Sequence, residues 1–172
     1  DYIHTGTLQA DGDATLTIAN NLNNQSQMLA GGVMSIQAAN IDNANSGSII
    51  ASQTGLATPG TLNNRGLIDG QDTHITSASL NNLGTGRIYG DQLSIAAVTL
   101  NNDAENAQAP VIAARNRLDL GVDTLNNHAH ALIFSAGDMA IGGALDAARQ
   151  ATGQAGGINN TSATIESLGN LD

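Results

Sequence analysis

The sequence predicts an all-β protein, a parallel β-helix (solenoid) of seven to eight rungs with about 20 residues per rung. Two observations carry this prediction. An apolar residue followed by two Asx residues recurs at a nearly constant interval, and short alternating segments separated by turn residues fill the space between recurrences. The stretch Thr61–Asn82 shows one complete cycle, from Leu62-Asn63-Asn64 to Leu80-Asn81-Asn82.

The doublet occurs seven times, at residues 22–24, 41–43, 62–64, 80–82, 100–102, 125–127 and 158–160, in steps of 19, 21, 18, 20, 25 and 33 residues. Asn tolerates the left-handed turn conformation, and identical amides that stack from rung to rung form hydrogen-bonded ladders. We therefore expect Asn63 and Asn64 to stack on their counterparts in neighbouring rungs, with a structural Asn ladder at the first position of every doublet except 41–43, which has Asp42 there. The residues of this ladder are Asn23, Asn63, Asn81, Asn101, Asn126 and Asn159.

Short strands separate the doublets. Segments such as Leu93-Ser94-Ile95 and Leu118-Asp119-Leu120 alternate apolar and polar residues, which is typical of a strand with one buried face. One such unit cannot bury its own apolar face, but stacked units can. At about 4.8 Å per rung, the stack predicts a rod of roughly 35–40 Å. Its inward side chains should include Leu62, Ile68, Ile75 and Leu80.

A helical solenoid and a β-sandwich are the alternatives to the β-helix. A helical solenoid needs a longer repeat with a 3.6-residue period, and the short repeat with Asn and Gly punctuation excludes it. A β-sandwich would give strand spacings of about 8–12 residues, which this chain also shows roughly. The recurring doublet favours the β-helix over the sandwich.

Two departures from the repeat are predicted insertions. Residues 103–110 replace a short turn and should bulge outward as a loop. Residues 142–157 form a larger insertion, whose centre at 144–154 is rich in helix formers and bounded by Gly pairs, so we expect a short helix outside the rod with Leu145, Ala148 and Thr152 facing inward. Binding residues concentrate on loops. The candidate partner-binding residues are therefore Leu145, Asp146, Arg149 and Gln150.

Composition and charge exclude several functions. The chain has a net charge of −10, with five Arg and no Lys, which opposes binding to nucleic acid and docking on an anionic membrane surface. No apolar run approaches the roughly 18 residues of a membrane span, so we expect no membrane insertion by this segment. The absence of Cys removes disulfides and thiolate chemistry.

No constellation in the sequence indicates an enzyme, a cofactor or a metal site. Parallel β-helices also host polysaccharide lyases, which need a basic residue beside a carboxylate cluster. Arg115 and Arg117 are the best basic pair, but no carboxylate cluster is evident around them. His128 and His130 have a two-ligand spacing without a third ligand, and Asp11-Gly12-Asp13 lacks the remaining ligands of a calcium loop. We therefore expect neither catalysis nor a bound cofactor.

The pattern Leu-Asn-Asn-x-Gly-x-Ile, followed by a short alternating strand, resembles the haemagglutinin repeat of filamentous haemagglutinins and contact-dependent inhibition exoproteins. It is clearest from Leu62 to Ile75, with Leu80 to Ile95 and Leu125 to Ile141 close behind. The resemblance extends over essentially the whole chain. It implies a right-handed parallel β-helix secreted by Gram-negative bacteria through two-partner secretion, by way of an outer-membrane transporter.

The resemblance also implies a role at the bacterial cell surface. We expect residues 1–172 to form a single β-helix segment from the interior of a longer chain, a stalk that presents a distal adhesin or contact-dependent toxin. The alternative is an adhesive module that binds a receptor or glycan on a host or neighbouring bacterial cell through its insertions. Uncapped end rungs also predict end-to-end self-association of the excised segment.

Overall fold

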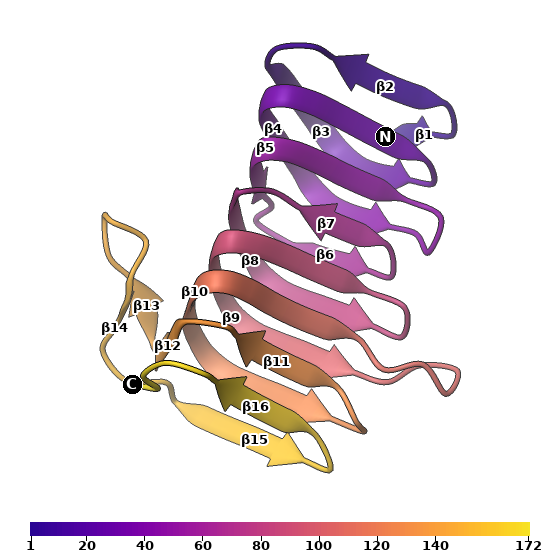
Figure 1. Cartoon of the computed structure of the whole chain (residues 1–172). Coiled ribbons are helices and arrows are strands. Elements are labelled where there is room, and N and C mark those ends of the chain that lie inside the picture. The colour runs from indigo at the N-terminus through magenta and orange to yellow at the C-terminus, as the bar shows by residue number, and fades with distance from the viewer.

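The computed structural model describes residues 1–172 and contains sixteen β-strands and no helix (Figure 1). The strands are β1 (Tyr2–His4), β2 (Thr7–Ala10), β3 (Ala14–Asn24), β4 (Gln27–Asn43), β5 (Ser48–Ala57), β6 (Thr61–Asn64), β7 (Leu67–Asp69), β8 (Asp72–Leu83), β9 (Arg87–Asp103), β10 (Val111–His128), β11 (Leu132–Ser135), β12 (Asp138–Gly142), β13 (Ala144–Leu145), β14 (Ala151–Thr152), β15 (Gly157–Thr161) and β16 (Thr164–Ser167).

Equivalent strand segments stack into three parallel columns. Column A begins at Thr7–Ala10 and ends at Thr164–Ser167, and column B begins at Ala14 and ends with β12. Column C begins with β1 and ends with β15. Long strands such as β4 and β9 bend round the corners and contribute to all three columns. The chain is therefore a β-solenoid of about seven turns, which confirms the predicted fold class.

The core is a continuous file of aliphatic side chains inside the three columns. The four residues expected to point inward, Leu62, Ile68, Ile75 and Leu80, are each 0% exposed. They belong to a single cluster of 27 buried residues that runs through the solenoid. Because each rung adds only a few Leu, Ile, Met or Ala side chains, apolar burial accumulates by stacking and not within any one repeat.

The predicted helix at 144–154 is wrong. Strands β13 and β14 pair in antiparallel fashion and form a hairpin, which projects from the side of the solenoid with its tip toward the N-terminal end (Figure 1). A helix of this length nucleates poorly. Asp146 closes a turn instead, since its carboxylate accepts the N–H groups of Ala148 and Gln150 at 2.8 and 2.9 Å. Leu145 is half-buried, whereas Ala148 and Thr152 are exposed.

The segment that follows β9 is a small projecting turn. Glu105 and Gln108 form an antiparallel bridge, and Asn106 and Ala107 between them have positive φ angles of 52° and 59°. The chain then returns to column A at Val111, so the stacking of the rungs on either side is undisturbed.

Exposed large apolar side chains collect at the two ends of the solenoid. Tyr2 and Ile3 lie in the first rung, and Ile158, Leu168 and Leu171 lie in the last. Only two others, Val33 and Val98, lie between the ends. With no helix in the fold, there is none that could cross a membrane.

Candidate functional site

The second Asn of each doublet builds a ladder inside the solenoid. Side-chain amides donate from rung to rung toward the C-terminal end, with N···O distances of 2.8–2.9 Å. The members are Asn24, Asn43, Asn64, Asn82, Asn102, Asn127 and Asn160. All except Asn160 are fully buried. Each buried amide also donates to a backbone carbonyl of the next rung, such as Asn82 to Val111, so no amide hydrogen is left unpaired.

The first Asn of each doublet builds a second, shorter ladder on the outside of column C. Asn126 donates to Asn101, Asn101 to Asn81, and Asn81 to Asn63, over 2.8–2.9 Å. These bonds run toward the N-terminal end, opposite to the inner ladder. Asn23 lies beside Asp42, which cannot donate, and Asn159 instead accepts the hydroxyl of Thr161. The structure therefore brings four of the six predicted ladder residues together.

His4 occupies the inner-ladder position of the first rung. It is in register with Asn24, is 4% exposed, and its Nε2 lies 2.9 Å from the carbonyl oxygen of Gln27. Asn24 makes the equivalent bond to Ser48 one rung further on. In the sequence, His4 follows Tyr2-Ile3 and therefore stands where later rungs carry the second Asn of the doublet.

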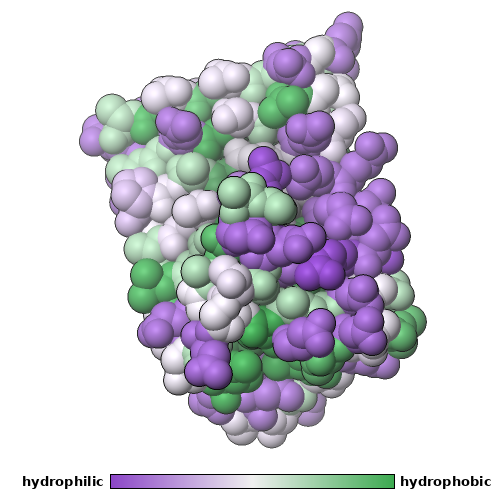
Figure 2. All heavy atoms as spheres, turned by 90° about the vertical axis from the view of Figure 1, so that its left-hand side faces the viewer, coloured by the Kyte–Doolittle hydropathy of each residue, from purple (hydrophilic) through white to green (hydrophobic).

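The hairpin carries all four candidate binding residues. Asp146, Arg149 and Gln150 are exposed at its tip, and Leu145 lies lower, against the solenoid. Figure 2 shows this side of the molecule, where hydrophilic side chains gather across the middle and apolar ones collect toward the C-terminal end. Because the Asp146 carboxylate accepts backbone N–H groups within the turn, Arg149 and Gln150 are the polar side chains that the tip presents. Arg149 also reaches back to the Asp72 carboxylate at 3.1 Å.

Asp119 anchors the base of the hairpin. Its side chain points outward from column B but is covered, and the residue is 5% exposed. One oxygen accepts the backbone N–H of Ala151 at 2.9 Å, and the carboxylate also receives two bonds from Arg117 at 2.7 and 2.9 Å. The hydrogen bond to Asp119 raises the pKa of Arg117 above its ordinary value.

Gly121 lets the hairpin lie close to the sheet. A Cβ atom at this position would stand 2.4 Å from the carbonyl carbon of Ala144, so only Gly fits beneath the hairpin. Sequence reasoning missed both Asp119 and Gly121. The only sequence signal for the hairpin anchor was Asp119 itself, a single acidic residue at an outward position between Leu118 and Leu120, which point inward.

His74 and Ser94 lie near Arg149 of the hairpin tip. The His74 Nδ1 is 2.9 Å from the Ser94 hydroxyl, and Nε2 is 3.2 Å from the Thr76 hydroxyl. Burial lowers the pKa of His74, and the positive charge of Arg149 adds to this effect, while Asp72 opposes it. The imidazole therefore favours its neutral form. No carboxylate orients it against the serine, which separates this pair from a nucleophilic triad.

Arg115 is surrounded by carboxylates, contrary to the expectation that none lie near it. It bonds to Asp69 at 3.1 Å and to Asp91 at 3.0 Å, from two different rungs. The hydrogen bond to Asp69 raises the pKa of Arg115. The guanidinium takes the place that a cation would occupy between these acids. Arg115 and Arg117 thus belong to separate ion-pair groups and form no joint basic site.

Arg65 also forms a structural ion pair, and the His128–His130 segment forms no metal site. Arg65 bonds to Glu105 at 2.6 and 2.9 Å, which ties the projecting turn to a rung two turns earlier and lowers the pKa of Glu105. Ala129 and His130 have positive φ angles, so His128 and His130 do not leave one face of a strand. No group of three or more His, Asp or Glu side chains is arranged to hold a metal ion.

A family model described as haemagglutinin repeat matches residues 1–38. These residues form the first rungs of the solenoid, and the later rungs repeat their architecture in register. The match and the fold together confirm the resemblance to filamentous-haemagglutinin-like repeats. The family is typical of secreted or surface-exposed bacterial proteins and is not a known enzyme family. No curated protein and no solved structure matches the chain.

Proposed function

We propose that this chain is a stalk segment of a secreted bacterial surface fibre, which holds a distal adhesin or contact-dependent toxin away from the cell. The inner Asn ladder is the observation that supports this proposal best. It links seven successive rungs through fully paired, almost wholly buried amides, and the three parallel columns continue across the same rungs. Such a structure resists bending and carries load along its axis without needing a ligand.

The rest of the proposal follows from the repeat family. The outer-membrane transporter of two-partner secretion is its proposed partner during export from a Gram-negative cell. An extended chain that gains stability rung by rung can fold as it emerges, because each new rung stacks on the last. Four of the five Arg residues pair with acidic side chains, which fits a mechanical role.

A direct test of the rod uses its repeat. Duplicating residues 62–79 inserts one rung within β8, just before Leu80, and should lengthen the particle by about 4.8 Å, measured by small-angle X-ray scattering. Thermal unfolding should remain cooperative, since the added rung supplies its own Asn and Leu residues. An unfolded product, or one of unchanged length, contradicts the rod.

A second candidate function is adhesion through the hairpin. The specific observation is that Arg149 and Gln150 are exposed on a turn held in place by Asp146, Asp119 and Asp72. An ordered, exposed tip lowers the entropy cost of binding.

Cell binding separates the two functions. The purified chain is compared, on host cells and on bacteria, with a variant in which a short Gly-Ser turn replaces residues 143–156. A passive stalk binds in neither form. If the chain binds and the variant does not, while both give the same β-type circular dichroism, the hairpin is an adhesin and the passive stalk is excluded.

A further inference from the structure

The outer face of column A carries an apolar patch in the C-terminal half of the solenoid. Val111 and Ala113 of β10 lie beside Leu132 and Phe134 of β11, and Tyr89 of β9 lies one rung before Ala113. All five side chains point outward and are half-buried. The chain has only three aromatic rings, and two of them are here. A contiguous apolar patch on a flat sheet indicates an interaction surface.

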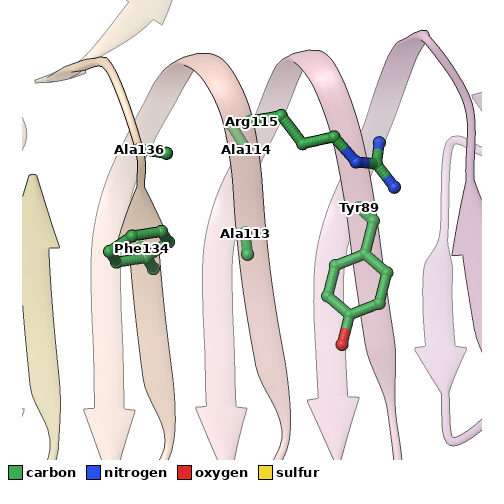
Figure 3. A pocket seen from close by; sticks show the side chains of 6 residues that line it. All are labelled: Tyr89, Ala113, Ala114, Arg115, Phe134 and Ala136. Atoms are coloured by element: carbon green, nitrogen blue, oxygen red, sulfur yellow. The ribbon is translucent and has the colours of Figure 1, made fainter. Parts of the chain in front are cut away.

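Ala113 forms the floor of a slot in this patch (Figure 3). Tyr89 and Phe134 stand on the two neighbouring rungs, so the small side chain between them leaves a hollow of about 300 Å³ bounded by Arg115 and Ala136. Arg115 points away from Phe134, toward the rung of Tyr89 and beyond (Figure 3). The slot therefore has room for an aromatic ring.

The edges of the patch carry polar groups that lack a partner of opposite charge. Arg87 is the one Arg without an acidic partner, and it donates only to the carbonyls of Gly86 and Ala109. Glu166 of β16 makes no ion pair, although the other Glu of the chain does. In a chain of net charge −10, an unpaired Arg among apolar side chains is a feature of protein interfaces.

We propose that a second copy of this chain packs on column A, face to face, about a two-fold axis that is parallel to the strands and passes between the β10 and β11 rungs. Such an axis reverses the order of the rungs and keeps each position along the strand. Phe134 of each copy then enters the Ala113 slot of the other. Val111 of each copy meets Leu132 of the other.

The same axis places Glu166 of one copy over Tyr89 of the other, with Arg87 two residues along the strand. The carboxylate thus reaches both the guanidinium and the Tyr89 hydroxyl, for which the structure shows no protein partner. The same two-fold axis places Phe134 in the slot and pairs Arg87 with Glu166, and it does so in both copies. The interface is self-complementary, as a closed dimer requires.

The size of the face sets the strength of the association. Four rungs at about 4.8 Å and four residues at about 3.3 Å give roughly 250 Å² per copy. That is below the area of stable interfaces, so we expect a transient dimer with a dissociation constant on the order of 0.1–1 mM.

Charge reversal tests whether Arg87 of one copy faces Glu166 of the other. Dimerisation of the full chain is measured by sedimentation velocity over a concentration series to about 1 mM. Arg87→Glu and Glu166→Arg alone should each weaken dimerisation about tenfold, and the double variant should restore it. Ala113→Phe fills the slot and should abolish the dimer. Val98→Ser, on an exposed side chain of another face, is the matched control and should change nothing.

Other outcomes overturn the proposal. A strict monomer at all concentrations excludes it. So does an association that survives Ala113→Phe, because contacts between the exposed ends would then be responsible. If the double variant dimerises no more strongly than the single variants, the proposed two-fold axis is excluded. Circular dichroism of each variant confirms that the solenoid is intact before these results are read.

Discussion

Asn64 donates its Nδ2–H to the Oδ1 of Asn82 over 2.8 Å, and both side chains are 0% exposed. The two residues belong to successive repeats and lie in register in β6 and β8. The same amide also donates to the carbonyls of Gly66 and Arg87, while its oxygen accepts from Asn43. One side chain therefore joins three rungs, which is why an Asn at this position recurs through the fold.

Replacing Asn64 by Ala should destabilise the solenoid strongly. The substitution removes the bonds to Asn43 and Asn82, leaves their polar groups unpaired, and opens a cavity. A loss of about 2–4 kcal/mol in the free energy of unfolding follows from these costs, measured by urea denaturation. Asn81→Ala is the control, because it removes a half-buried amide of the outer ladder and should cost about 1 kcal/mol or less. Equal losses for both variants would contradict a special role for the inner ladder.

Much of the fold could be predicted because successive repeats carry apolar and Asn residues at the same positions. Leu62 and Leu80 identify the buried face, and the Asn residues beside them identify the turn at which rungs stack. A single doublet does not show which Asn is buried, since most rungs carry Asn at both positions. Asp42 distinguishes the two positions. It replaces Asn at an outer-ladder position, so the outer ladder tolerates the loss of a donor, whereas the inner-ladder position is Asn in every rung from Asn24 to Asn160.

The hairpin could not be predicted because its structure depends on contacts outside it. Residues 144–154 have good intrinsic helix propensity, but Asp119 accepts the N–H of Ala151 and Asp72 pairs with Arg149. These partners lie 32 and 77 residues away in sequence. Long-range polar contacts and a local Asp146 turn outweighed a propensity worth only tenths of a kcal/mol per residue.

Gly121→Ala should lift the hairpin from column B. The added methyl group collides with the backbone of Ala144, so the bond from Ala151 to Asp119 should open. Trypsin cleavage after Arg149 should then accelerate several-fold, and the Ala151 amide should exchange faster, while the solenoid unfolds at nearly the same urea concentration. Gly157→Ala provides the matched control, because no heavy atom lies within 4 Å of a Cβ at that position. Unchanged cleavage in Gly121→Ala would show that the hairpin is not held by this close approach.

Ser77→Ala should stabilise the protein. The Ser77 hydroxyl is the one buried side-chain polar atom without a hydrogen-bond partner. Removing it eliminates a desolvation cost, so the free energy of unfolding should rise by about 1 kcal/mol. Thr73→Val is the informative comparison, because the Thr73 hydroxyl donates to the carbonyl of Tyr89 at 2.7 Å and its loss should destabilise by about 1 kcal/mol. A stability loss in Ser77→Ala would indicate a bond to that hydroxyl in solution.

Mild acid should weaken the docking of the hairpin through His74. Burial and the charge of Arg149 lower the pKa of His74 in the folded chain, so the unfolded chain binds the proton more readily. Stability is therefore complete above the unfolded pKa of about 6.5 and declines as the pH falls through that value toward the lower folded pKa. Urea denaturation at about pH 7.5 and about pH 5.5 should show this decline, and His74→Gln should reduce it. Trypsin cleavage after Arg149 should accelerate over the same range in the native chain but not in His74→Gln. A decline of equal size in both proteins would assign the pH dependence to other groups.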